Sequence, residues 1–238
     1  MSLIRNWRDE EPVVRHMSAV VWVGMRPRQD GGTDPLLCLE KLRGFARHAL
    51  QGRKTSDHHQ HHHMEQVYYI ISGRGEALCG EKRYTVAEGD AVYLPTDVPH
   101  QMFNTGDAWI EHHVISMGVE GTGGACVIRN WRDAAPEGDG AGAIRWRLLG
   151  REGDEEAGVL RGMRFVDRGA VQPCSDSASQ VHPDVEQGYY ILEGEGRLAV
   201  EGEEQRIVEG DMIHLPAGTT CHFRNPGERW LTYDAVGV

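Results

Sequence analysis

The 238-residue sequence has no long hydrophobic run, no excess of positive charge and no closely spaced pair of cysteines. Its formal net charge of -11 argues against nucleic acids and anionic membrane surfaces as partners, because both require a basic face. No apolar segment is long enough to span a bilayer, and the charged start, MSLIRNWRDEEP, lacks the apolar stretch of a signal peptide. The five scattered cysteines form no CxxC pair. We therefore expect a cytoplasmic protein with reduced thiols.

An internal repeat organises the chain. Residues 65–75 read EQVYYIISGRG and residues 186–196 read EQGYYILEGEG, so the two segments lie 121 positions apart (186 − 65 = 121). The same offset aligns VAEGDAVYLP, which begins at Val86, with IVEGDMIHLP, which begins at Ile207. Two ordered matches at one offset are typical of a duplicated domain.

A third match opens each half. The pentapeptide IRNWR begins at Ile4 and again at Ile128, an offset of 124 (128 − 4 = 124), so three residues of insertion or deletion (124 − 121 = 3) separate it from the other matches. We place the boundary in the Gly-rich stretch Gly118–Ala125. This gives an N-terminal domain of residues 1–120 and a C-terminal domain of residues 121–238.

Each half is patterned as short strands separated by turns. The segment from Val67 to Ile71 is rich in β-branched and aromatic residues and ends at a Ser-Gly turn. The segment from Tyr84 to Val86 runs into the turn sequence Glu-Gly-Asp, and the next apolar run ends at Pro95. Helical periodicity is weak. These features predict an all-β fold of jelly-roll or barrel type in both halves.

The later segment of each half resembles the second motif of the cupin superfamily. That motif runs Gly, five residues, Pro, one residue, Gly or Asp, two residues, His, three residues, Asn. The first half matches it in full with Gly89, Pro95, Asp97, His100 and Asn104. Both halves resemble the family, so the resemblance covers most of the chain. It implies two tandem cupin barrels, each a jelly roll or double-stranded β-helix.

The first cupin motif is matched upstream in the same half. His59 and His61 supply the family's His-x-His pair, and Gln66 lies seven residues before Gly73 (73 − 66 = 7). The resemblance implies four metal ligands in the N-terminal barrel: His59, His61, His100 and, at the fourth position, Gln66. Glu65 is the competing choice for that fourth position.

Strand geometry makes this set plausible independently of the family. Residues two apart on a strand point to one face, so His59 and His61 can converge on one point. Glu65 and Gln66 lie on opposite faces of a regular strand, and periodicity does not decide which of them joins. Three imidazoles and an oxygen donor suit one divalent transition metal: Zn, Ni, Fe, Mn or Co.

The histidine run around this pair has a second interpretation. Such runs also occur as loose metal-binding surface segments, although this one is internal and coincides with the ligand segment. Its other members, His58, His62 and His63, are expected at the surface or around the site. His112 and His113 are expected to be exposed or hydrogen-bonded rather than in the pocket.

The second half departs from the pattern at its metal positions. With the 121-residue offset, the four ligand positions become Gln180, His182, Gln187 and Cys221. Two of the three histidines are therefore replaced. Cys221 still offers a thiolate beside His182 and Gln187 for a soft metal. We favour a barrel without metal, in which Cys221 is a small buried residue.

Cupins include many enzymes as well as storage and sensing proteins, so the fold leaves the function open. The spacing of the histidine pair, Gln66 and the distant histidine is similar to that of small cupins that process unsaturated uronates. We expect a metal-dependent isomerase or lyase that acts on a small oxygenated metabolite, such as a sugar acid, keto acid or enediol, by Lewis-acid chemistry. An Fe(II)-dependent dioxygenase is one alternative, weakened by the neutral Gln66. A non-catalytic small-molecule-binding bicupin is the other.

Candidate proton-transfer groups are Glu65, if it faces inward, and an extra histidine such as His63. Arg47 is a candidate partner for a substrate carboxylate. Further substrate contacts are expected from barrel-lining residues: Tyr68, Met102 and Trp109. The expected partner is a small-molecule substrate, with neither nucleic acid nor membrane, and the chain is expected to be a monomer or homodimer.

Overall fold

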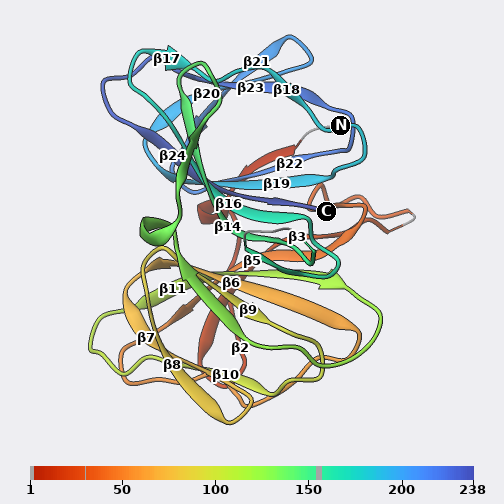
Figure 1. The fold of residues 1–238 in the computed structure, drawn as a ribbon, viewed down its shortest axis with the longest axis vertical. Coiled ribbons are helices and arrows are strands. Elements are labelled where there is room, and N and C mark those ends of the chain that lie inside the picture. The colour runs from red at the N-terminus through yellow and green to blue at the C-terminus, as the bar shows by residue number, and fades with distance from the viewer. Residues whose placement is uncertain (1–2, 30, 154–156) are drawn as a thin grey trace.

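The computed structural model describes residues 3–29, 31–153 and 157–238. Two β-barrels lie one above the other, the first built mainly from the N-terminal half and the second mainly from the C-terminal half (Figure 1). The described residues form strands and two short 3-10 turns. None of them forms a helix long and apolar enough to cross a membrane. The all-β fold with two barrels is therefore confirmed.

The elements of the first half are β1 (Leu3–Asn6), η1 (Trp7–Asp9), β2 (Val13–Arg15), β3 (Ala19–Pro27), β4 (Leu37–Leu39), β5 (Leu42–Leu50), β6 (Met64–Ser72), β7 (Arg74–Cys79), β8 (Lys82–Ala87), β9 (Asp90–Leu94), β10 (His100–Phe103) and β11 (Ile110–Gly118). Those of the second half are β12 (Val127–Asn130), η2 (Trp131–Asp133), β13 (Pro136–Gly138), β14 (Ala143–Arg151), β15 (Gly158–Leu160), β16 (Phe165–Val171), β17 (Ser175–Asp176), β18 (Gln180–Val181), β19 (Gln187–Glu193), β20 (Glu195–Val200), β21 (Glu203–Val208), β22 (Asp211–Leu215), β23 (Thr220–Asn225) and β24 (Leu231–Gly237).

The N-terminal barrel consists of a large and a small sheet. The large sheet has the strand order β12-β9-β6-β11-β5-β3-β2, with β4 added to β3, and the small sheet has the order β10-β7-β8. Side chains alternate between the two faces of each strand, so every second residue of β5, β6 and β11 points into the barrel. The barrel core contains the buried side chains of Ile70, Val86, Leu94, Met102 and Ile110.

The C-terminal barrel repeats this arrangement. Its large sheet has the order β1-β22-β19-β24-β16-β14-β13, with β15 added to β14. Its small sheet has the order β17-β23-β20-β21, and β18 also pairs with β23. The core of this barrel contains Ile191, Leu198, Ile213, Phe223 and Leu231.

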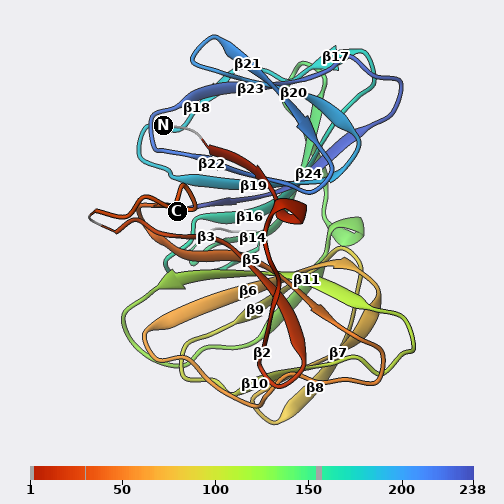
Figure 2. The ribbon, with the colours of Figure 1, turned by 180° about the vertical axis from the view of Figure 1, so that it is seen from behind.

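Each half contributes its N-terminal arm to the barrel of the other half. β1 pairs with β22, with Ile4 opposite Ile213, and β12 pairs with β9, with Ile128 opposite Val92. In Figure 2 the red N-terminal strand runs beside the blue barrel before the chain descends to β2. The two IRNWR segments are therefore exchanged. The stretch Gly118–Ala125 connects two barrels whose edge strands are interleaved.

The outward faces of the two large sheets pack against each other. The shared core between them contains Phe45, Tyr69 and Tyr93 from the first half and Tyr190 and Met212 from the second half, all of them buried. The opposite face of each large sheet is turned into its own barrel. Alternate residues on these strands therefore point either toward the other barrel or into the interior of their own barrel.

Candidate metal centre

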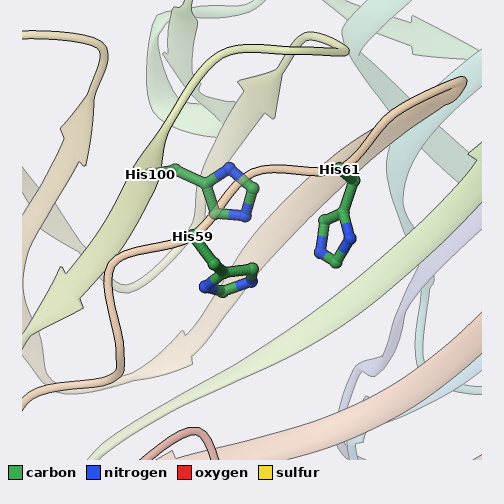
Figure 3. A group of neighbouring side chains, drawn as sticks. All are labelled: His59, His61 and His100. Carbon is green, nitrogen blue, oxygen red and sulfur yellow. The ribbon is translucent and has the colours of Figure 1, made fainter.

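His59, His61 and His100 lie around one space in the N-terminal barrel (Figure 3). His100 begins β10, and His59 pairs with it through an isolated antiparallel bridge, in which the two backbone hydrogen bonds measure 3.2 and 2.7 Å. One ring nitrogen from each of the three histidines lies within 4.8 Å of the others. The fold therefore brings together the three histidines that the sequence motif singled out.

In two of these rings a hydrogen bond at Nδ1 leaves Nε2 unprotonated. Nδ1 of His100 donates to the Val98 carbonyl at 3.1 Å, and Nδ1 of His59 lies 3.2 Å from the Asp57 carbonyl. Burial lowers the pKa of His100 to about 4 and also lowers the pKa of His61, so both rings are neutral at pH 7. A neutral imidazole oriented through one nitrogen is the form that binds a metal with the other.

Gln66 points into the same cavity from β6. Its Nε2 donates to Ser116 Oγ at 3.0 Å, which fixes the orientation of the amide. Gln66 Oε1 and His100 Nε2 are both buried and have no hydrogen-bond partner among the described residues. Leaving a buried polar atom unpaired costs about 1–3 kcal/mol. An amide oxygen facing neutral imidazoles is a donor set that suits a borderline divalent metal, so the residues present fit such an ion.

Glu65 lies on the other face of β6 and outside the cavity. Its carboxylate accepts hydrogen bonds from the backbone N–H groups of residues 161–163 at 2.8–2.9 Å and from the Tyr93 hydroxyl at 3.1 Å. The expectation that Glu65 is a ligand or a base is corrected, because its oxygens are fully buried in the contact with the second half. Of the two neighbours, Gln66 faces the histidines.

Glu186 is the counterpart of Glu65 (186 − 65 = 121) and makes the equivalent contact with the first half. It accepts from the backbone N–H groups of residues 40–42 at 2.6–2.9 Å and from Nε2 of His214 at 2.8 Å. The repeated glutamate thus serves the contact between barrels in both halves. Gln66 is repeated as well, as Gln187, so the repeat alone does not separate the roles of the glutamate and the glutamine.

The cavity measures about 140 Å³ and contains three further histidines. His48 on β5 and His112 on β11 are cross-strand neighbours with rings 5.5 Å apart, and His16 stacks on His59 at 5.0 Å. Burial lowers the pKa of His48 to about 3 and lowers the pKa of His112 well below its ordinary value. Nδ1 of His112 is buried and unpaired within the described part of the chain, which differs from the exposed or hydrogen-bonded side chain expected.

Arg47 lies on the opposite face of β5 from His48 and does not reach the cavity. Its guanidinium lies 3.8 Å from the centroid of the Trp7 ring and pairs with Glu111 at 2.8 Å. Arg47 therefore holds the exchanged N-terminal arm rather than a substrate carboxylate. Strand alternation is the signal that links these placements, because a cavity position for His48 requires Arg47 to face the other barrel.

Of the other expected contacts, Tyr68 and Met102 line the cavity, whereas Trp109 and His63 lie outside it. Trp109 is 47% exposed on a loop before β11. His63 is exposed in a left-handed turn (φ 55°) before β6. Neither side chain is placed to touch a molecule in the cavity, so the substrate role of Trp109 and the proton-transfer role of His63 are corrected.

In the second barrel the corresponding positions make hydrogen bonds to one another. The Tyr189 hydroxyl donates to Gln187 Oε1, and Gln180 Nε2 lies 3.4 Å from that hydroxyl and 3.9 Å from Cys221 Sγ. Burial raises the pKa of Cys221 to about 11, so its thiol is protonated. No convergent group of three potential metal ligands occurs here among the residues that the structure describes.

Comparison with known proteins places this geometry in a family. Residues 47–117 and 168–233, one segment in each barrel, match the model of the cupin domain. An uncharacterized protein of Methanocaldococcus jannaschii is 37% identical over 49 residues, which is 21% of this chain and 39% of that protein. One of Streptomyces coelicolor is 36% identical over 47 residues, or 20% of this chain and 45% of that protein. The chain thus aligns with less than half the length of either relative.

Solved structures resemble the whole chain at low identity. A putative glyoxylate-induced protein of Pseudomonas aeruginosa has a TM-score of 0.78 and 17% identity, and covers 100% of this chain and 88% of its own. Pirin YhhW of Escherichia coli in complex with nickel(II) has a TM-score of 0.75 and 12% identity, with coverage of 100% and 99%. A variant of Bacillus subtilis oxalate decarboxylase has a TM-score of 0.73 and 12% identity, with coverage of 98% and 76%. The family model matches in both barrels and these structures share their fold, so the chain belongs to the cupin family.

Proposed function

We propose that the chain is a metal-dependent enzyme that acts on a small oxygenated metabolite, such as a sugar acid, keto acid or enediol, in the N-terminal barrel. The observation that carries this proposal is the convergence of His59, His61 and His100 with the unpartnered Gln66 Oε1 at one cavity. A structural neighbour with the same fold binds nickel(II), which supports a divalent ion in such a barrel.

A divalent transition metal held by these four residues would supply Lewis-acid polarisation of a substrate carbonyl. The cavity of about 140 Å³ restricts the substrate to a small molecule. Met102 and Val114 give it apolar walls, and burial keeps the pKa of Tyr68 raised, so that its hydroxyl stays protonated and able to donate a hydrogen bond. The neutral rings of His48 and His112 orient polar groups rather than carry charge.

His16 and Asp57 supply a proton-transfer pair at the same cavity. Nδ1 of His16 lies 3.0 Å from Asp57 Oδ1, so the carboxylate orients the ring and leaves Nε2 free to accept a proton. His16 lines the cavity beside His59. We therefore assign to His16 the role of general base that the sequence had suggested for Glu65 or His63.

The donor set bears on the dioxygenase alternative. With Glu65 held by the other barrel, the oxygen donor at the site is the neutral amide of Gln66. A neutral set leaves the metal more electron-poor than a set with a carboxylate, which favours polarisation of a bound oxygen over electron donation to dioxygen. This favours isomerase or lyase chemistry over Fe(II)-dependent oxygenation.

Metal analysis of untagged protein tests the site. We expect about one equivalent of bound metal in the wild type, a large loss in His100→Ala, and wild-type content in His63→Ala, which removes an exposed histidine of the same run. Full metal content in His100→Ala would contradict the assignment.

A panel of sugar acids, keto acids and enediols, followed by NMR, tests the chemistry. We expect turnover that depends on metal and consumes no dioxygen, and a fall in kcat of about 100-fold or more in His16→Gln at unchanged metal content. Oxygen uptake would support the dioxygenase instead. Bound metal and ligand without turnover would support a non-catalytic binding bicupin.

A further inference from the structure

The C-terminal barrel contains a cavity of about 250 Å³ at the place that corresponds to the histidine cavity of the N-terminal barrel. Its lining includes His182 and Gln187, which the 121-residue offset maps onto His61 and Gln66. The two cavities are therefore versions of one pocket, and their linings can be compared position by position.

The inner part of the second pocket is filled by aromatic rings. Gly169 and Tyr233 stand where the first barrel has His48 and His112 (169 − 48 = 121, 233 − 112 = 121). A Cβ on Gly169 would lie 2.3 Å from the Tyr233 ring, so no imidazole can occupy that position. The Tyr233 ring also stacks on Phe223 with centroids 4.6 Å apart. The space of the imidazole cluster is thus closed.

The outer part of the second pocket carries arginines. Arg145 and Arg147 on β14 line it, and the 124-residue offset of this region places Val21 and Val23 at the matching positions of β3 (145 − 124 = 21, 147 − 124 = 23). Arg164, just before β16, lines it as well. Three guanidinium groups therefore border a pocket whose counterpart has valines on the corresponding strand.

The carboxylates near these arginines do not balance their charge. Buried Asp167 pairs with Arg147 through bonds of 2.5 and 3.3 Å and also lies 3.9 Å from Arg145 Nε, and Arg145 pairs in addition with the surface residue Glu137. The Arg164 guanidinium has no carboxylate within ion-pair distance among the residues described. The pocket thus has an excess of positive charge in a partly enclosed space, where charge interactions are stronger than in water.

The polar lining also includes a neutral histidine and a fourth arginine that is already engaged. The His182 pKa is lowered, first by burial and then by Arg145 and Arg164, so its ring offers a hydrogen bond without charge. Arg168 also borders the pocket, but its guanidinium donates to the Tyr69 hydroxyl at 2.9 Å and lies 4.6 Å from the centroid of the Trp131 ring, in the contact between barrels. The groups that remain for a ligand are Arg164, His182 and the N–H donors of Arg145 that do not face Glu137 or Asp167.

We propose that this arginine-lined pocket of the C-terminal barrel binds a small carboxylate-bearing anion without a metal. A planar guanidinium presents paired N–H donors that match the two oxygens of a carboxylate. Arg164 and Arg145 form the anion contact, Arg147 and Asp167 form the fixed wall, and the stacked Tyr233 closes the base. The duplicated pocket thus recognises oxygen-rich molecules in two ways, with histidines in one barrel and guanidinium groups in the other.

Isothermal titration with malonate tests this proposal, with malonamide as the uncharged molecule of similar shape. We expect malonate to bind the wild type and malonamide to bind much more weakly. Arg164→Gln is expected to weaken malonate binding at least about tenfold, because it removes a charge-assisted contact. Arg43→Gln is the matched control, since Arg43 is the exposed counterpart of Arg164 in the first barrel (164 − 121 = 43) and is expected to bind malonate as the wild type does.

Two further variants keep the proposal separate from the metal centre and from folding defects. His100→Ala is expected to retain malonate binding, whereas loss of binding there would move the anion to the first barrel and overturn the proposal. Arg145→Gln serves as a second arginine variant, because its partner Glu137 is exposed and the buried Asp167 keeps its shorter ion pair with Arg147. Equal binding of malonate by wild type, Arg164→Gln and Arg145→Gln, or equal binding of malonate and malonamide, would also overturn it.

Discussion

His113 and Asp234 occupy equivalent positions in the two halves (234 − 113 = 121), and their side chains meet between the barrels, with His113 Nδ1 2.6 Å from Asp234 Oδ2. Both side chains are almost fully buried, at 0% and 2% exposure. A residue that contacts its own counterpart lies on the local two-fold axis that relates the barrels. In a pair of identical halves the same contact would join two histidines or two aspartates. The His113–Asp234 pair therefore favours association of one N-terminal half with one C-terminal half over association of two identical halves.

The first prediction concerns this pair. Replacing Asp234 with Ala leaves His113 Nδ1 without its hydrogen-bond partner in a dry interface, and we expect the free energy of unfolding to fall by about 1–3 kcal/mol. Urea denaturation measures the change. Asp107→Ala is the control, because Asp107 pairs with Arg53 at the surface, where both side chains are mostly exposed, and it should lower the free energy of unfolding far less. Equal effects of the two changes would show that the buried pair does not stabilise the interface.

The second prediction concerns acid. Burial alone would raise the pKa of Glu186, but hydrogen bonds from His214 and the backbone N–H groups of residues 40–42 outweigh it and lower the pKa to about 2. A carboxyl whose pKa is lower in the folded state stabilises the protein above its unfolded pKa, near 4.5, and this contribution is lost as the pH falls toward 2. We expect the contribution to be roughly 3 kcal/mol.

The measurement compares unfolding free energies at pH 6 and pH 3 in the wild type, Glu186→Gln and Glu228→Gln. Glu186→Gln should be less stable at pH 6 and should lose less stability on acidification than the wild type does. The exposed Glu228→Gln change should leave the acid dependence unchanged. An acid dependence that persists in full in Glu186→Gln would rule out this carboxyl as its source.

The third prediction restores histidines to the second barrel. Gln180 and Cys221 face each other in the register between β18 and β23, as His59 and His100 do across their isolated bridge. His182 and Gln187 are already present beside them. We expect the double variant Gln180→His, Cys221→His to raise the bound metal from about one to about two equivalents per chain. Each single variant has one histidine fewer and should keep about one equivalent of bound metal. A double variant that also binds about one equivalent would mean that the stacked aromatic rings exclude the ion.

The fourth prediction tests the packing of the second pocket. Gly169→Ala places a methyl group 2.3 Å from the Tyr233 ring, so Tyr233 must leave its stack on Phe223. We expect a loss of about 1–3 kcal/mol in unfolding free energy. Gly138→Ala is the matched control, since nothing lies within 4 Å of its Cβ and its backbone is not left-handed. A Gly169→Ala variant as stable as the control would mean that the ring has room to move.

Much of this architecture could be predicted because the repeat and the motif spacing are local patterns. They locate both barrels, the three histidines and the replaced positions in the second half. The choice between Glu65 and Gln66 could not be made locally, because it depends on which face of β6 meets the other barrel. The IRNWR repeat marks the same place in each half, but its sequence does not specify which sheet edge the segment joins.

The positions of His16, His48 and His112 in the cavity could not be predicted for a related reason. They lie in three separate segments of the sequence, and they meet only when β5 and β11 pair with His48 opposite His112 and the turn after β2 places His16 beside His48. The arginines of the second pocket escaped attention in the same way, because they came from β14 and from the loop before β16. Residues that converge from distant segments are visible only after the pairing register is known.

The exchange of arms bears on how the molecule tolerates a break in its chain. A protease cut in the segment 119–126 would not release two finished domains, because β1 would still be hydrogen-bonded to β22 and β12 to β9. A half produced on its own would expose the bare backbone edge of β9 or β22, a template for aggregation. Two copies of the first half could cover that edge by exchanging β1, but His113 would then face His113. The interleaved edges and the mismatched pair on the axis together commit the chain to folding as one cooperative unit.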